Sequence, residues 1–116
     1  MHEISVLHQA VTLAEEAAEA NGVNHLAYIT LEVGELSGCL PVFFEKYFPV
    51  VIENRPVFAD CQLRITVRRG EALCLDCDAM YNVMACEGRC PRCGSRFKKV
   101  LGGEDVMLKE IGSADA

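Results

Sequence analysis

Two pairs of cysteines constrain this chain more than any other feature, because each pair can form one half of a metal site. The segments Cys74-Leu-Asp-Cys77 and Cys90-Pro-Arg-Cys93 are separated by twelve residues, which gives the pattern C-x2-C-x12-C-x2-C. Two such turns can present four thiolates to one tetrahedral ion, with Zn–S bonds of about 2.3 Å. Because four protein ligands leave no open position for a substrate, we expect a structural zinc site that folds this segment.

Other interpretations of the cysteines stay open at this point. A dithiol redox centre uses one C-x-x-C pair and leaves the second pair without a role, whereas iron bound by four thiolates has the same spacing as zinc. Cys39 and Cys61 stand beside apolar residues, and we expect them to pack as small hydrophobic side chains. Cys86, between the two pairs, is either a spare thiol or an alternative ligand.

The cellular compartment follows from the same residues. The chain has seven cysteines, an odd number, and no apolar run near the roughly 18 residues of a membrane span. Its start has neither the charge nor the apolar stretch of a secretory signal. We therefore expect a reducing, cytoplasmic location without a membrane partner, where thiols stay free or bind metal.

Hydrophobic periodicity predicts an order of elements around the cysteine segment. Gly70 on one side and Gly102-Gly103 on the other bracket that segment, which is therefore an insertion and not a terminal domain. Pro49 removes a hydrogen bond and should break or end the second helix early. The predicted elements are a helix over 3–20, a strand over 27–33, a turn over 34–38, a helix from residue 40, a strand over 61–68 and a weaker strand over 105–111.

Charge argues against a nucleic-acid partner. The formal net charge is −6, the wrong sign for neutralising phosphates. The stretch 68–100 is the exception at +3, but four thiolates and one Zn(II) would reduce it to about +1. A zinc-ribbon adaptor that binds protein or nucleic acid through the basic residues 89–99 is the alternative function, with protein contact favoured over nucleic acid.

The N-terminus offers a second kind of metal site. The α-amine of Met1, the backbone nitrogen of His2 and the His2 imidazole can chelate one ion, and Glu3 can add an oxygen. A nitrogen-rich planar ligand set suits Ni(II) or Cu(II) better than Zn(II). A frayed terminus with Glu3 complementing the helix dipole is the alternative interpretation.

An enzymatic function is not expected. The three histidines all lie before residue 26, and no nucleophile set, phosphate-binding loop or open three-ligand zinc site can be assembled with them.

The combination of Met1-His2-Glu3 at the start of a helix, Val33-Gly34-Glu35-Leu36-Ser37-Gly38 after a strand, and two inserted C-x-x-C pairs resembles the HypA/HybF nickel metallochaperone family over residues 1–111. The resemblance implies an α+β fold in which two helices pack on a three-stranded sheet, with an inserted four-Cys zinc-ribbon-like subdomain. It implies a discontinuous nickel-binding domain, 1–69 and 104–116, and a zinc-binding domain, 70–103.

The resemblance also implies function and partners. Met1, His2 and Glu3 would hold the transported Ni(II), and Cys74, Cys77, Cys90 and Cys93 the structural Zn(II). A HypB-type GTPase or related ATPase would be the partner, and the large subunit of nickel–iron hydrogenase the recipient, with urease as a second possibility. Because no histidine follows His25, the switching of zinc ligands to histidine seen in some relatives is not expected here.

Overall fold

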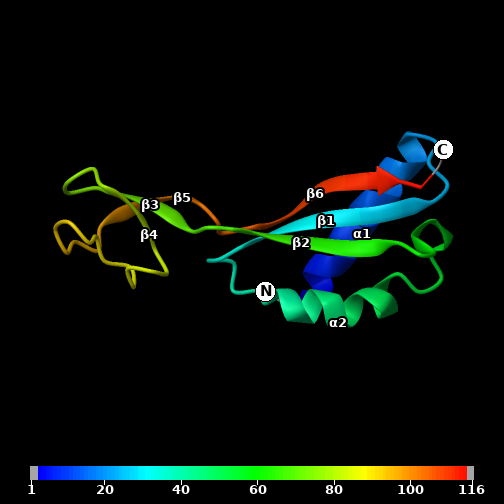
Figure 1. The fold of residues 1–116 in the computed structure, drawn as a ribbon, viewed down its shortest axis with the longest axis horizontal. Coiled ribbons are helices and arrows are strands. Elements are labelled where there is room, and N and C mark those ends of the chain that lie inside the picture. Colours follow the sequence, from blue (N-terminus) through cyan, green and yellow to red (C-terminus); the bar gives the residue numbers. More distant parts are fainter. Residues whose placement is uncertain (1–2, 115–116) are drawn as a thin grey trace.

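The structure is a computed structural model, and it describes residues 3–114. The molecule is elongated, 53 × 25 × 16 Å, with two small sheets that follow one another along the long axis (Figure 1). The first sheet carries two helices and the larger core, and the second carries the four cysteines. The predicted α+β fold with an inserted zinc-ribbon-like subdomain is confirmed.

Helix α1 spans Glu3–Ala20, as the periodicity predicts. Its buried stripe includes Leu7 and Val11, each fully buried, and such burial is worth roughly 1.5–3 kcal/mol per side chain. The helix ends where Asn21 donates from its side-chain amide to the Ala17 carbonyl at 2.7 Å, and Gly22 follows with φ of 67°. Within residues 3–114, no helix is both long enough and apolar enough to cross a membrane.

Helix α2 spans Pro41–Val51 and buries Phe44 and Phe48 in the core. Pro49 lies in the last turn of the helix, so the predicted early end is observed, but the turn itself stays intact and the Ile52 N–H donates to the Phe48 carbonyl at 3.1 Å. The helix ends two residues beyond the proline. A short 3-10 helix, η1 (Pro56–Phe58), follows and adds the buried Phe58 ring edge-on to Phe48.

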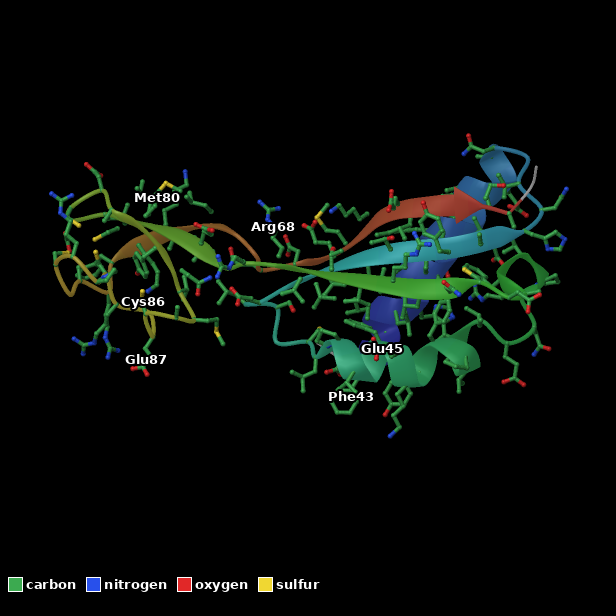
Figure 2. The ribbon with its side chains drawn as sticks, viewed as in Figure 1. Phe43, Glu45, Arg68, Met80, Cys86 and Glu87 are labelled. Carbon is green, nitrogen blue, oxygen red and sulfur yellow. The ribbon has the colours of Figure 1, made fainter. Side chains whose placement is uncertain are left out.

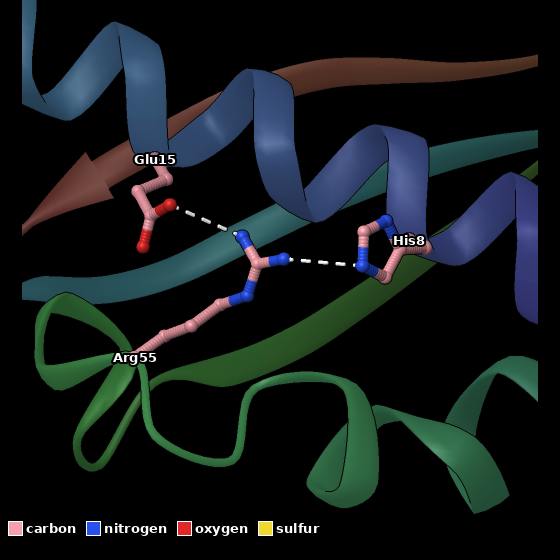
Figure 3. A network of polar contacts seen from close by, with 3 residues as sticks. All are labelled: His8, Glu15 and Arg55. Carbon is pink, nitrogen blue, oxygen red and sulfur yellow. Dashed lines mark hydrogen bonds and ion pairs between the residues drawn. The ribbon is translucent and has the colours of Figure 1, made fainter.

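The loop between α2 and η1 is held against α1 by Arg55. Its guanidinium donates from Nη1 to Oε1 of Glu15 at 3.1 Å, and Nη2 lies 3.3 Å from Nε2 of His8 (Figure 3). Because arginine can only donate, Nε2 of His8 is the acceptor in this contact. The Arg55 side chain thus connects two turns of α1 to the loop between α2 and η1.

The first sheet, called the main sheet below, contains β1 (Leu26–Gly34), β2 (Gln62–Arg68) and β6 (Val106–Ser113) in the order β2-β1-β6. β1 is parallel to β2, with α2 in the crossover, and antiparallel to β6. Ile29, Leu31 and Val33 of β1 are buried in the core, as the alternation predicts. β6 continues past the predicted end at Ile111, because Gly112 leaves the space that the Tyr28 ring occupies.

The second sheet and its loops cover residues 71–102 and are together called the four-Cys subdomain below. It contains β3 (Glu71–Cys74), β4 (Met80–Asn82) and β5 (Lys98–Gly102), all antiparallel in the order β4-β3-β5. Sequence analysis predicts none of these strands, because three to five residues are too few for a periodic signal. As predicted, the subdomain is inserted between β2 and β6. The molecule is thin at Arg68, where the two sheets are joined (Figure 2).

Candidate metal centre

The four cysteines of the two C-x-x-C pairs meet in the four-Cys subdomain. Their Sγ atoms all lie within 4.8 Å of one another. Each close pair joins one cysteine from each turn, with Cys74 and Cys93 at 3.5 Å and Cys77 and Cys90 also at 3.5 Å between Sγ atoms. The structure thus brings together the four cysteines that the sequence pattern selects.

The two C-x-x-C turns, called knuckles below, share one backbone pattern. In the first, the Asp78 N–H donates to the Cys74 carbonyl at 2.9 Å, and in the second the Gly94 N–H donates to the Cys90 carbonyl at 2.8 Å. Asp78 and Gly94 both have positive φ, 62° and 77°. Gly94 thus closes the second turn, and Asp78 is its counterpart in the first, although aspartate adopts this conformation less readily than glycine.

Side chains join the two knuckles directly. The Ser95 hydroxyl donates to the carboxylate of Asp76, which lies between the cysteines of the first knuckle. The same hydroxyl oxygen accepts from the Phe97 N–H at 3.1 Å. Asp76 and Ser95 could not be singled out from the sequence, because residues 19 apart in the chain become neighbours only when the knuckles face each other.

The thiols influence one another's acidity. Burial of Cys90 acts to raise the pKa of its thiol. Hydrogen bonds from the backbone N–H groups of Cys93 and Arg92 and from nearby thiols outweigh burial and lower this pKa to about 7. The Ser95 N–H has a lowering effect on Cys93, but the neighbouring Cys74 thiol and burial raise the pKa of Cys93 to about 12. One thiolate therefore forms readily and opposes the next, so four thiolates need a cation to compensate their charge.

The thiol arrangement fits a tetrahedral metal ion. Four Zn–S bonds of about 2.3 Å place the sulfurs about 3.8 Å apart, close to the spacing of the two pairs. Thiolate ligands suit zinc and also iron. Four ligands close the coordination sphere, so the ion would fold the subdomain, whose buried core contains only four side chains among the described residues, Ala72, Cys74, Tyr81 and Cys90.

The three remaining cysteines lie outside this group. Cys86 is on the loop between the knuckles, half-buried, and does not belong to the cluster of four thiols (Figure 2). Cys39 is buried in the core of the main sheet. Burial raises the pKa of Cys61 to about 11, although a hydrogen bond with the Ile29 backbone lowers it by a smaller amount. Both pack as hydrophobic side chains, as predicted.

The N-terminal ligand set falls partly outside the structure. Met1 and His2 lie outside the described residues, and Glu3 is the first residue of α1, half-buried in its first turn. The other two histidines are exposed, but His8 accepts a hydrogen bond from Arg55. Within residues 3–114, the metal-ligating cluster is the four-thiol group alone.

Comparison with known proteins identifies the family that shares this sequence and fold. The family model described as "Hydrogenase/urease nickel incorporation, metallochaperone, hypA" matches residues 1–113. The hydrogenase maturation factor HypA of Campylobacter jejuni is 32% identical over 111 residues, which are 96% of this chain and 97% of the relative. The hydrogenase maturation factor HybF of Klebsiella pneumoniae is 31% identical with the same coverage of both chains.

Solved structures agree with this result. The solution structure of the nickel metallochaperone HypA from Helicobacter pylori matches with a TM-score of 0.72 and 27% identity, over 97% of both chains. The names of the family and of these relatives describe metallochaperones and maturation factors, not enzymes. The chain therefore belongs to the HypA family of metallochaperones for nickel incorporation.

Proposed function

We propose that this chain binds Ni(II) at its N-terminus and delivers it to nickel–iron hydrogenase, or to urease, during maturation. The observation that carries the proposal is that the family match runs from residue 1 and so includes Met1-His2-Glu3. The relatives named as hydrogenase maturation factors support the hydrogenase as recipient.

The proposed nickel ligands are the Met1 amine, the His2 backbone nitrogen and imidazole, and a Glu3 oxygen. Few exchangeable ligands at a chain end favour transfer by stepwise substitution. Protons compete for the amine and imidazole, whose ordinary pKa values are about 7.7–8.0 and about 6.5, so affinity should fall in acid. His8 is not included, because Arg55 occupies its acceptor nitrogen.

We propose that Cys74, Cys77, Cys90 and Cys93 hold a structural Zn(II). Their closed arrangement supports a folding role, and saturation of this site keeps zinc separate from the N-terminal ligands. The separate cores of the main sheet and the four-Cys subdomain support a division into a nickel-binding domain, 1–69 and 104–116, and a zinc-binding domain, 70–103.

The proposed partners are a HypB-type GTPase or related ATPase and the hydrogenase large subunit. A nucleotide-dependent partner is required if transfer uses nucleotide energy, since this chain has no phosphate-binding loop in its sequence. The seven cysteines, all free in the structure, support the reducing cytoplasm as the location.

The test is metal analysis after equilibrium dialysis against Ni(II), comparing protein with an untagged Met1 to His2→Ala. We expect one zinc in both proteins and one nickel only in the unsubstituted protein. A Cys86→Ala control should retain both metals. Equal nickel in the first two proteins would refute the N-terminal site, and nickel that displaces zinc would refute the proposal of two independent sites.

A further inference from the structure

The turn that follows β1 is inserted between the two connections that lead into and out of the four-Cys subdomain. The Glu35 N–H donates to the Arg68 carbonyl at 2.9 Å on one connection. On the other, the Leu36 N–H donates to the Gly103 carbonyl at 2.7 Å and the Gly34 N–H to the Asp105 carbonyl at 2.9 Å. Residues 34–36, which lie in the sequence motif 33–38 and are not part of either proposed metal site, therefore form the joint between the two sheets.

Close packing limits movement of this joint. A Cβ atom on Gly103, whose φ is 88°, would lie 2.7 Å from the Arg69 carbonyl oxygen. A Cβ atom on Gly70 would lie 2.5 Å from Cγ of Leu36. The backbones of the two connections thus approach each other and the turn too closely for side chains at these positions.

The Glu35 side chain extends this contact into the subdomain. Its Oε1 atom accepts from the Gly70 N–H at 2.8 Å and from Nδ2 of Asn82 at 2.9 Å. Asn82 ends β4, and its Oδ1 accepts from the Ala85 N–H at 2.8 Å, which fixes the orientation of its amide. One carboxylate oxygen on the turn after β1 is therefore bonded both to a connection and to a strand of the subdomain.

The charge of the carboxylate strengthens this arrangement. The Gly70 N–H and then the Asn82 amide lower the pKa of Glu35, burial opposes them by a smaller amount, and the positive charge of Arg69 adds a still smaller lowering effect. Hydrogen bonds to an ionised acceptor are stronger than those to a neutral one.

We infer that Glu35 is a positioning residue that holds the four-Cys subdomain in one orientation relative to the main sheet, through its bonds to Gly70 and Asn82. The inference goes beyond the proposed function and does not depend on nickel binding. Its consequence for a metallochaperone is that a partner would meet the two parts of the chain as one preformed surface. The two connections are only two and three residues long, and the backbone hydrogen bonds of residues 34–36 fix the joint itself, whereas the Glu35 side chain is the contact that reaches β4 of the subdomain.

The test measures orientation directly, by ¹⁵N relaxation and residual dipolar couplings of the zinc-loaded full chain without nickel. In the unsubstituted protein, one alignment tensor should fit the amides of residues 26–34 and 71–102 together. Glu35→Ala removes both bonds, and a common tensor should then fail, with a shorter correlation time for residues 71–102. Glu35→Gln keeps an amide oxygen at the Oε1 position, so the common tensor should be retained.

Changes on the partner side separate a positioning role from a merely structural one. Asn82→Asp keeps an oxygen acceptor for the Ala85 N–H but replaces the amide donor with a second carboxylate, so it should uncouple the two parts as Glu35→Ala does. Adding Glu35→Gln to Asn82→Asp supplies a donor in the reverse direction and should restore the common tensor. Glu32→Ala is the matched control, because Glu32 pairs with Arg68 and Lys109 within the main sheet, at 3.9 and 3.7 Å.

One zinc per chain and unchanged core amide shifts establish that each variant is folded. A common tensor in both Glu35→Ala and Asn82→Asp would overturn the inference and leave the backbone bonds of residues 34–36 as the cause of the fixed orientation. This result would not affect the proposed function, whose test depends on nickel.

Discussion

Arg55 and Glu15 are joined by an ion pair of 3.1 Å although they lie 40 residues apart, and the pair fastens the crossover loop to the helix that begins at Glu3 (Figure 3). The Arg55 side chain is only 19% exposed, so its aliphatic part is also packed. Arg55→Ala should lower the free energy of unfolding of the main sheet and its helices by about 1 kcal/mol, because the ion pair and the packing of the arginine stem are both lost. Urea denaturation of zinc-loaded protein measures this loss.

A double-mutant cycle with Glu15→Ala separates the two contributions. The coupling energy between residues 15 and 55 should be about 0.2–1 kcal/mol and should decrease at high salt. A coupling of zero would mean that packing of the arginine stem accounts for the whole effect.

Removal of the metal should unfold one part of the chain and leave the other. The core of the four-Cys subdomain is too small to be stable by itself, whereas the main sheet has its own core. A strong chelator, or Cys93→Ala, should therefore collapse the amide dispersion of residues 71–102 while residues 3–34 keep their shifts. Cys86→Ala is the matched control and should keep zinc and dispersion; loss of zinc in that variant would make Cys86 a ligand.

The backbone of the second knuckle should tolerate a side chain poorly for conformational reasons alone. A Cβ atom on Gly94 meets nothing within 4 Å, but the φ of 77° disfavours any L-residue. Gly94→Ala should therefore lower the stability of the zinc-loaded subdomain by about 1 kcal/mol. The corresponding Asp78→Gly should change stability by less than about 0.5 kcal/mol, because relief at φ of 62° is offset by the greater freedom of glycine in the unfolded chain.

The two variants are compared by the urea concentration at which the amide signals of β3 and β5 lose half of their folded intensity, measured at a fixed excess of zinc. Equal losses for Gly94→Ala and Asp78→Gly would show that the two knuckles do not share the backbone requirement.

Acid should remove the contribution of Glu35. Because its pKa is below the ordinary value of 4.5 in the folded protein, the ionised carboxylate contributes stability that is fully present above about pH 4.5 and is lost as pH falls through the folded pKa. Unsubstituted protein should exceed Glu35→Gln in stability at neutral pH, and the difference should vanish below this range. Urea midpoints of the two proteins are compared at a fixed zinc excess, over the pH range in which both still hold one zinc per chain, so that unfolding of the four-Cys subdomain does not contribute to the difference.

A difference that is constant between pH 7 and pH 3 would show that residue 35 does not contribute through its charge.

Local patterns in the sequence were sufficient for the first helix, for two strands of the main sheet and for the grouping of four cysteines. The stripe through Leu7 and Val11 and the alternation along β1 and β2 repeat within a few residues, so the helix and both strands could be predicted within one residue of their observed limits. The four cysteines could be assigned to one site because the spacing within each pair already brings two thiolates to one turn.

Contacts between distant residues were decided only by the tertiary structure. The parallel pairing of β1 with β2, the bond from Ser95 to Asp76 and the bonds of Glu35 to Gly70 and Asn82 join residues from 19 to 47 positions apart. Nothing in the local sequence around Glu35 distinguishes a carboxylate in solvent from one bonded to another subdomain. That distinction arises because β1 ends where the chain enters and leaves the four-Cys subdomain, and packing there brings one acceptor within reach of two donors.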